Sequence, residues 1–542
     1  MKLKLLAGLL LLAAGPAVAQ RPAPPRLIVA ISVDQLSADL FAQYRQHFTG
    51  GLRRLSGGVV FPSGYQSHAA TETCPGHSTI LTGARPARTG IIANNWFDLN
   101  AARADKYVYC AEDERVPGST SASYTVSPFH LRVPALGDLM RRADPRSRAV
   151  AVAGKDRAAV MMGGHNPDQR WWWGSPTFVS HAGIAVPAAV TQANRGIADA
   201  LARARPPIPL PDLCEARSRA VAVPGRAAPV GTGRYAREAG DRNAWRASPE
   251  SDAAVLGLAL AFRDEMRLGE GPAADLLAIG LSATDYVGHS YGTEGAEMCI
   301  QLLALDRALG EFFAALDRDR IDYAVMLTAD HGGHDLPERI RQQAGGDAAR
   351  VDPALRAGTM GEAIGRRLRL AGPVLFGDGP FGDIYVDRAL PARTRARVLA
   401  EAAAAYRAHR QVEAVFTRAQ IAAAPAPSGP PDRWTLIERA RASWDAQRSG
   451  DLYVMLKPRV TPIAEPGPGY VATHGSPWDY DRRVPILFWR RGMAPFEQPL
   501  AVETVDIMPT LAALIGLPLA PDSVDGRCLD LDPGPESSCP AS

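Results

Sequence analysis

The sequence has no large excess of charge of either sign. Its 542 residues include 60 lysines and arginines against 57 aspartates and glutamates, for a formal net charge of +3 at pH 7. Lys2 and Lys4 lie in an N-terminal leader, and their removal takes the charge from +3 to +1. A protein that binds nucleic acid through its surface charge carries a basic patch or stripe. The near balance therefore argues against a nucleic-acid partner.

The chain also lacks a hydrophobic run long enough to cross a membrane. The apolar run Leu5–Ala14 has ten residues, whereas a membrane-spanning helix needs about 20. Two lysines before this run and Ala17-Val-Ala19 after it are typical of a secretory signal peptide, residues 1–19, cleaved before Gln20. We therefore expect a periplasmic or secreted protein that has no membrane contact after signal removal.

Cysteine is scarce, and no pair has the C-x-x-C spacing of a thiolate zinc site. The six cysteines are Cys74, Cys110, Cys214, Cys299, Cys528 and Cys539. An even number in an exported chain favours disulfides, and Cys528 with Cys539, across a Pro/Gly loop, is the first pair expected. Any bound metal must then be held by histidines and carboxylates.

Apolar runs recur along the chain and alternate with amphipathic helical stretches. The runs are residues 27–33, 149–153, 276–281, 323–328, 373–376 and 484–489, and helices are expected at 297–316 and 394–409. Continuous apolar runs are typical of strands buried on both faces. The alternation predicts an α/β fold with a mostly parallel central sheet and helices on both faces. We expect one catalytic domain over residues 27–530, with insertions.

One long stretch interrupts this alternation. Residues from about 165 to 250 contain Trp171-Trp-Trp173 and the proline-rich segment Pro206–Pro211. We predict an insertion here that lies over the core. Two roles stay open for the three tryptophans: stacking on a substrate's leaving group, and packing against the fold or forming a fold-back surface, which is the more common role of such a run.

The most informative stretch is Thr71-Glu-Thr-Cys-Pro-Gly-His-Ser78. Pro75 and Gly76 indicate a tight turn, and residues 77–83 predict a short helix that ends at a glycine. Thr73 would then lie at or near a helix N-terminus, where free backbone N–H groups and the dipole favour an anion. An isolated threonine of this kind is usually an N-cap. In this chain we predict that it meets a phosphate-like group.

Polar side chains follow three of the predicted strands where each strand ends. They are Asp34, then Asp285 with His289, and then Asp330 with His331. In an open α/β sheet, ligands bind outside the carboxyl ends of the strands. Three converging carboxylates repel one another unless cations lie between them. Histidine and carboxylate ligands without thiolates suit zinc or a similar divalent ion.

Seven short motifs cover nearly the whole mature chain. They are Val33-Asp34, Thr73-Cys-Pro-Gly-His77, Gly90-Ile-Ile-Ala-Asn94, Gly154-Lys155-Asp-Arg157, Asp285-x-x-x-His289, Asp330-His331-Gly332 and Thr473-His474-Gly475. On these motifs and their order, the chain resembles the alkaline phosphatase superfamily. Within it, the chain is most similar to the threonine-nucleophile bacterial alkaline phosphatases, which are related to type I phosphodiesterases/nucleotide pyrophosphatases.

The resemblance implies a site with two zinc ions per chain. One zinc would be held by Asp285, His289 and His474, and the other by Asp34, Asp330, His331 and the hydroxyl of Thr73. The phosphoryl oxygens would be contacted by Asn94, Lys155 and Arg157. Metal coordination lowers the pKa of a hydroxyl and so activates a threonine as a nucleophile.

The implied activity is that of an exported alkaline phosphatase acting on small-molecule phosphate monoesters through a phosphothreonine. Lys155 and Arg157 favour a monoester, because its two charges and three free oxygens reward two cations and an amide. A diester has one charge and a second substituent that the cations would crowd. We expect the protein to be a monomer.

Other functions fit parts of the same pattern. The nearest alternative is a type I phosphodiesterase/nucleotide pyrophosphatase, and a phosphonate hydrolase of the superfamily is more distant. A sulfatase is disfavoured, because Cys74 directly precedes Pro75 and no arginine follows as formylglycine formation requires. A non-enzymatic exported protein that binds phosphate or metal would be indicated by loss of Thr73 or of a ligand, and none is missing.

Overall fold

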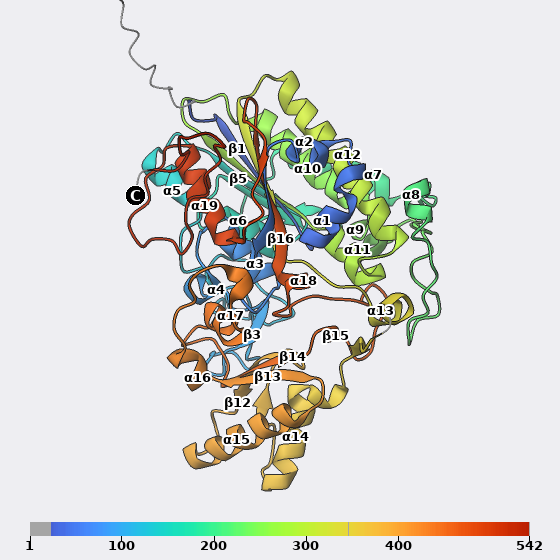
Figure 1. The fold of residues 1–542 in the computed structure, drawn as a ribbon, viewed down its shortest axis with the longest axis vertical. Helices are drawn as coiled ribbons and strands as arrows, with labels where there is room; N and C mark the ends of the chain where they lie inside the picture. The colour runs from blue at the N-terminus through green and yellow to red at the C-terminus, as the bar shows by residue number, and fades with distance from the viewer. Residues whose placement is uncertain (1–22, 345, 541–542) are drawn as a thin grey trace, which may run out of the picture.

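A ten-stranded sheet forms the centre of the computed structural model, which describes residues 23–344 and 346–540 (Figure 1). The predicted signal peptide lies outside the described residues. Strand order is β17-β2-β16-β9-β1-β8-β5-β6-β7, with β18 beside β2. The strands are β1 (Leu27–Val33), β2 (Val59–Tyr65), β5 (Ala149–Ala153), β6 (Gln169–Trp173), β7 (Phe178–Val179), β8 (Asp275–Leu281), β9 (Tyr323–Thr328), β16 (Arg483–Arg490), β17 (Phe496–Glu497) and β18 (Val502–Glu503).

The middle of this sheet is parallel. β1 pairs with β8 on one side and β9 on the other, and β5 joins β8 to β6, all in parallel register. β16 is antiparallel to both β9 and β2. The prediction of a mostly parallel central sheet is therefore confirmed.

Helices cover both faces of the sheet, because alternate residues of a buried strand point to opposite sides. Leu27 and Val29 of β1 pack in one core with α1 (Ala38–Tyr44), α2 (Gly51–Leu55), α7 (Ala188–Leu201), α10 (Pro249–Met266) and α12 (Ala296–Arg318). Ile28 and Ala30 pack in the other core with α3 (Thr73–Ile80), α5 (Leu136–Ala143), α6 (Asp156–Gly163) and α19 (Ile507–Leu514). Among the described residues, none of the helices has the length and hydropathy to cross a bilayer.

A second, smaller sheet lies at the lower end of Figure 1. Its order is β11-β12-β14-β13 and every pairing is antiparallel. The strands are β11 (Leu375–Phe376), β12 (Gly382–Val386), β13 (Val412–Thr417) and β14 (Leu452–Leu456), and α14 (Ala357–Leu368) and α15 (Ala392–Ala408) share their core. The expected strand at 373–376 and helix at 394–409 belong to this unit. Their assignment to the parallel sheet was wrong, because an apolar run does not specify its pairing partner.

The three consecutive tryptophans are part of the central sheet. They form the end of β6, which pairs with β5, so this start of the predicted insertion is a strand of the core. Trp171 and Trp173 pack on the α10 side, and the Trp173 ring lies 4.3 Å from that of Trp245. Of the two roles left open for these tryptophans, packing against the fold is therefore the one observed. The rest of the stretch carries β7, α7, α8 (Asp212–Glu215) and α9 (Arg242–Arg246).

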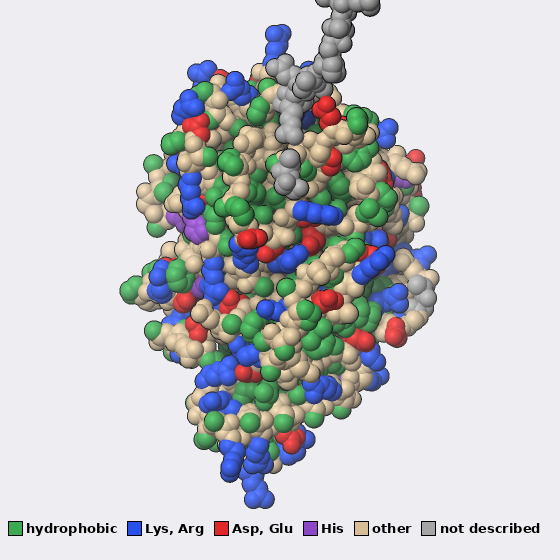
Figure 2. All heavy atoms as spheres, turned by 60° about the vertical axis from the view of Figure 1, so that its left-hand side comes forward, with side chains coloured by type: hydrophobic (Ala, Val, Ile, Leu, Met, Phe, Trp, Pro, Cys, Tyr) green, Lys and Arg blue, Asp and Glu red, His purple; other side chains and the backbone are tan. Residues whose placement is uncertain are grey.

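Charged side chains of both signs are mixed over the face drawn in Figure 2. Basic side chains are more numerous toward the lower end, which is formed by the second sheet and its helices.

All six cysteines pair. Cys528 is bonded to Cys539, as predicted, while Cys214 of α8 is bonded to Cys299 of α12 and Cys74 of α3 is bonded to Cys110. Cys110 directly follows β4 (Tyr107–Tyr109), which pairs with β3 (Asn95–Phe97). The Cys214–Cys299 bond therefore ties α8 to α12 on one face of the central sheet. The Cys74–Cys110 bond ties the segment after β4 to α3 on the other face.

We expect loss of the Cys214–Cys299 bond to lower the free energy of unfolding by about 2–5 kcal/mol, because it closes a long loop in the unfolded chain. The paired residues are 85 apart, against 11 for Cys528 and Cys539. Urea unfolding of Cys214→Ala/Cys299→Ala and of Cys528→Ala/Cys539→Ala would measure both losses. An equal or larger loss for the short loop would contradict this ranking.

Candidate active site

Three carboxylates meet at the carboxyl ends of three neighbouring strands. Asp34 follows β1, Asp330 follows β9, and Asp285 lies in the first turn of α11 (Ala283–Tyr291), directly after β8. All three side chains are buried. The Nε2 of His77 lies 3.3 Å from Asp34, and its Nδ1 lies 3.2 Å from Asp330. The convergence predicted from the strand ends is thus present.

The ligand atoms form two buried groups, and in each the atoms lie within 4.8 Å of one another. One group is Asp285, His331 and His474, and the other is Asp34, His77 and Asp330. This grouping differs from the implied ligand sets in two respects. His331 lies with His474, their ring centroids 3.5 Å apart, and His77 is an additional member.

The imidazoles are oriented by the backbone. In each, Nδ1 lies within hydrogen-bond distance of a carbonyl oxygen: His77 of Thr73 at 2.9 Å, His289 of Ala472, His331 of Gly332 and His474 of Thr71, each at 2.8 Å. A carbonyl can only accept, so Nδ1 carries a proton in each ring; when the ring is neutral, as it must be in a metal ligand, Nε2 offers the lone pair. The Nε2 of His289 lies 3.2 Å from Asp285. This orientation of the second nitrogen is usual for metal-binding histidines.

The charges in the two groups are strongly coupled. Burial opposes ionisation of Asp330, but the neighbouring His331 and His77 hold its pKa well below the usual value. Burial likewise acts against His77, yet Asp330 and Asp34 raise its pKa to about 10. Burial, with the charge of His331, lowers the pKa of His474 well below its usual value. A neutral His474 beside an ionised Asp285 suits a metal ligand pair.

The donor set fits divalent cations. Burying three carboxylates close together costs free energy unless positive charge compensates them. The hydroxyl of Thr73 is also buried and has no hydrogen-bond partner among the described residues, which is unfavourable unless something binds it. Oxygen and imidazole donors without thiolates are the ligands expected for zinc and related ions.

The helix that carries Thr73 begins earlier than predicted. α3 starts at Thr73, so Pro75 and Gly76 lie within its first turns rather than in a preceding turn. Proline is tolerated there, because the first N–H groups of a helix have no intrahelical partner. A Cβ on Gly76 would lie 1.9 Å from the carbonyl oxygen of Asp330, so this close approach requires glycine. The predicted turn at residues 75–76 was therefore wrong.

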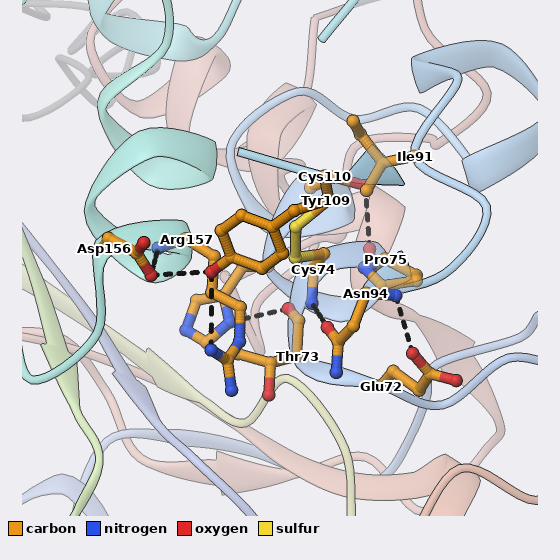
Figure 3. Close-up of a disulfide and its surroundings, with 12 residues drawn as sticks. Glu72, Thr73, Cys74, Pro75, Ile91, Asn94, Tyr109, Cys110, Asp156 and Arg157 are labelled. Atoms are coloured by element: carbon orange, nitrogen blue, oxygen red, sulfur yellow. Dashed lines mark hydrogen bonds between the residues drawn. A yellow bond between two sulfur atoms is a disulfide. The ribbon is translucent and has the colours of Figure 1, made fainter. Parts of the chain in front are cut away.

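Asn94 is fixed from three directions (Figure 3). Its backbone N–H donates to the Glu72 carboxylate at 2.6 Å, and its side-chain oxygen accepts from the backbone N–H of Cys74 at 2.8 Å. Its carbonyl accepts from the N–H of Cys110 at 2.9 Å. Burial raises the pKa of Glu72 to about 7. With its oxygen engaged, the Asn94 side chain offers its NH2 group, a donor, to the cleft that it lines.

The two cations of the Gly154-Lys155-Asp-Arg157 motif have different surroundings. The ammonium of Lys155 lies 2.9 Å from Asp34 and 2.5 Å from Asp285, between the two metal-ligand groups. Arg157 lines the cleft, and its Nη1 donates to the hydroxyl of Tyr109 at 3.4 Å. Arg157 is thus placed for contact with a ligand, while Lys155 lies against the carboxylates.

A cleft of about 800 Å³ opens over these residues. One wall is formed by the central-sheet side, with Thr73, Asn94, Arg157, His289 and His474. The opposite wall comes from the second sheet unit, with residues 356–359 at the start of α14 and 377–383 before and in β12. The cleft therefore lies between the two sheet units, and the residues predicted to act together line it or lie beneath it.

The comparison with known families agrees with this architecture. The family model described as type I phosphodiesterase/nucleotide pyrophosphatase matches residues 28–477. The chain belongs to this family. The resemblance inferred from the seven motifs is confirmed.

Two curated relatives and one solved structure match nearly the whole chain. Alkaline phosphatase PhoK of a Sphingomonas species is 60% identical over 95% of this chain and 93% of its own length. Alkaline phosphatase PhoD of Zymomonas mobilis is 49% identical over 95% of this chain and 89% of its own. The crystal structure of alkaline phosphatase PafA has a TM-score of 0.81 at 24% identity, covers 94% and 99% of the two chains, and supports the fold.

Proposed function

We propose that the protein is a metal-dependent alkaline phosphatase that hydrolyses small-molecule phosphate monoesters through a phosphothreonine. The observation that carries the proposal is the hydroxyl of Thr73, which has no hydrogen-bond partner within the described residues. It lines a cleft with Arg157 and His474, and the two groups of metal-ligand atoms lie beside it. The alkaline phosphatases at 60% and 49% identity support it.

The proposed ligands divide between two zinc ions. Asp285, His289 and His474 would hold one, and Asp34, Asp330, His331 and Thr73 the other. His331 lies near both groups, and its Nε2 is 3.2 Å from Asp330; His77, which contacts Asp34 and Asp330, is a further candidate. Bound there, two divalent cations would supply Lewis-acid stabilisation of the attacking and leaving oxygens.

In the first step the Oγ1 of Thr73 forms a bond to phosphorus as the ester P–O bond breaks, and the proton of the Thr73 hydroxyl leaves with the alcohol. Water then attacks phosphorus, the Thr73 O–P bond breaks, a proton of the water passes to Oγ1 of Thr73, and inorganic phosphate is released. Asn94 and Arg157, which line the cleft, would bind the phosphoryl oxygens, whose charge must be balanced in the transition state. Lys155 would balance the negative charge of Asp34 and Asp285 and add positive charge near the phosphoryl group.

We further propose that the protein acts outside the cytoplasm, in the periplasm or as a secreted monomer. Three disulfides support this location, because such bonds form and persist in oxidising compartments.

Removal of metal is expected to abolish phosphatase activity, and zinc is expected to restore it, with two ions bound per chain. His474→Ala should lower the stoichiometry toward one, because this imidazole belongs to only one group of ligand atoms. His409→Ala is the matched control, since His409 contacts Asp352 in the second sheet unit. Metal content is measured by atomic emission beside turnover of p-nitrophenyl phosphate. Full activity without metal, or equal metal loss in the two variants, would contradict the assignment.

A further inference from the structure

The hydroxyl of Tyr109 lies between the guanidinium of Arg157 and the carboxylate of Asp156 (Figure 3). The hydroxyl accepts from Nη1 of Arg157 at 3.4 Å and donates to Oδ1 of Asp156 at 2.7 Å. Asp156 and Arg157 are adjacent at the start of α6. A neutral phenol therefore separates opposite charges that are close enough in the chain to pair.

The second oxygen of Asp156 is also occupied. The hydroxyl of Tyr124 donates to Oδ2 at 3.1 Å, and the rings of Tyr109 and Tyr124 lie 4.8 Å apart. Two phenols thus satisfy the carboxylate from one side. Both oxygens of Asp156 thus accept from phenols, and neither contacts the guanidinium beside them.

The guanidinium of Arg157 forms no direct ion pair in the part of the chain that the structure describes. Within residues 23–344 and 346–540, no carboxylate lies at ion-pair distance from its guanidinium, and its buried Nε has no hydrogen-bond partner. Lys155, two residues earlier, is by contrast paired with two carboxylates. Because Arg157 lines the cleft, its charge is free to meet a phosphoryl group.

Tyr109 itself is held firmly. It ends β4, and its backbone N–H donates to the carboxylate of Glu112 at 2.8 Å. The next residue, Cys110, is bonded to Cys74 in the helix that Thr73 begins. The position of the phenol is therefore fixed relative to the nucleophile by a covalent link.

We propose that Tyr109 is a positioning residue, which holds Arg157 toward the cleft and prevents it from pairing with Asp156. The proposal rests on the phosphatase function proposed above. Removal of the hydroxyl in Tyr109→Phe lets Asp156 attract the guanidinium away from the phosphoryl group. Because the phenol acts through Arg157, its effect disappears when Arg157 is absent. A purely structural role would lower activity whether or not Arg157 is present.

The test is a double-mutant cycle on kcat/KM for p-nitrophenyl phosphate, with the metal-loaded enzyme. Tyr109→Phe is expected to lower kcat/KM about three- to tenfold, and less than about twofold in the Arg157→Ala background. Tyr124→Phe is the matched control: it removes a phenol from Asp156 but none from Arg157, so we expect a change below about twofold. Asp156→Asn should restore most of the activity of Tyr109→Phe, because a neutral amide no longer attracts the guanidinium.

Each outcome has a distinct meaning. Equal losses from Tyr109→Phe with and without Arg157, or no recovery on adding Asp156→Asn, would overturn the positioning role and leave the phosphatase function standing. If Arg157→Ala alone left monoester turnover unchanged, the proposed role of Arg157 in that function would itself be wrong. Coupling together with recovery would support the proposal.

Discussion

Thr73→Ala is expected to lower kcat/KM for p-nitrophenyl phosphate by at least roughly a thousandfold, the scale of loss on removing a covalent nucleophile. The hydroxyl is buried, lacks a hydrogen-bond partner among the described residues and lies in the cleft with His289 and His474. Metal content should stay close to that of the unchanged protein, because carboxylates and imidazoles supply the other ligands.

Two further variants separate the hydroxyl from the shape of the side chain. Thr73→Ser should keep much of the activity, since serine offers the same nucleophile, whereas Thr73→Val keeps the shape and should be as inactive as alanine. A radiolabelled phosphoenzyme should be trapped with the unchanged protein and with serine only. Near-normal turnover by the alanine or valine variant would refute the assignment of Thr73.

The sheet edge that carries the site could be predicted because its signal is local. Asp34 follows an uninterrupted apolar run, and such a run in an α/β chain is a strand buried on both faces. The parallel register of β1 with β8 and β9 then brings Asp34, Asp285 and Asp330 to one edge. Periodicity therefore sufficed for the middle strands of the central sheet and for the carboxylates at their ends, but not for β2 or β6.

The second sheet unit could not be separated from the first in the same way. Leu375–Phe376 and Val484–Trp489 are both short apolar runs, but β11 pairs with β12 whereas β16 joins the central sheet. Pairing depends on contacts between residues far apart in sequence, which periodicity does not record. The cleft wall formed by α14 was therefore beyond sequence analysis.

His77 shows a signal that was present but not used. It lies four residues after Thr73, so on a helix the two share one face. The prediction of a turn at Pro75 and Gly76 made the helix begin too late, after Thr73, and so hid the relation; in the structure α3 spans both residues. The contacts of Lys155 with Asp34 and Asp285 could not be predicted from local sequence, because the three residues follow three different strands.

The choice between monoester and diester depends on the charge around phosphorus. A monoester carries about two negative charges and three free oxygens, and each charged contact made in a sheltered transition state contributes about 2–4 kcal/mol. Among the described residues no carboxylate lies within ion-pair distance of Arg157, so its guanidinium is available to a ligand in the cleft. A diester offers less charge, and its second substituent would be crowded by the same groups. The family description names phosphodiesterase and pyrophosphatase, whereas the relatives at 60% and 49% identity are named alkaline phosphatases, so this contrast is decisive.

Lys155→Ala/Arg157→Ala is therefore expected to lower kcat/KM for p-nitrophenyl phosphate by on the order of 10³- to 10⁵-fold, at about 1.4 kcal/mol per factor of ten. For bis-p-nitrophenyl phosphate we expect kcat/KM to fall about tenfold or less. The diester carries less negative charge for the two cations to stabilise, and their removal relieves crowding of its second ester group. Arg157→Ala alone should carry most of the discrimination, since Lys155 pairs with carboxylates that serve both substrates. Arg356→Ala, on the opposite wall of the cleft, is the matched control and should change both rates little. Equal losses on the two substrates would make these residues general supports of the site, and a larger diester loss would favour a phosphodiesterase/pyrophosphatase.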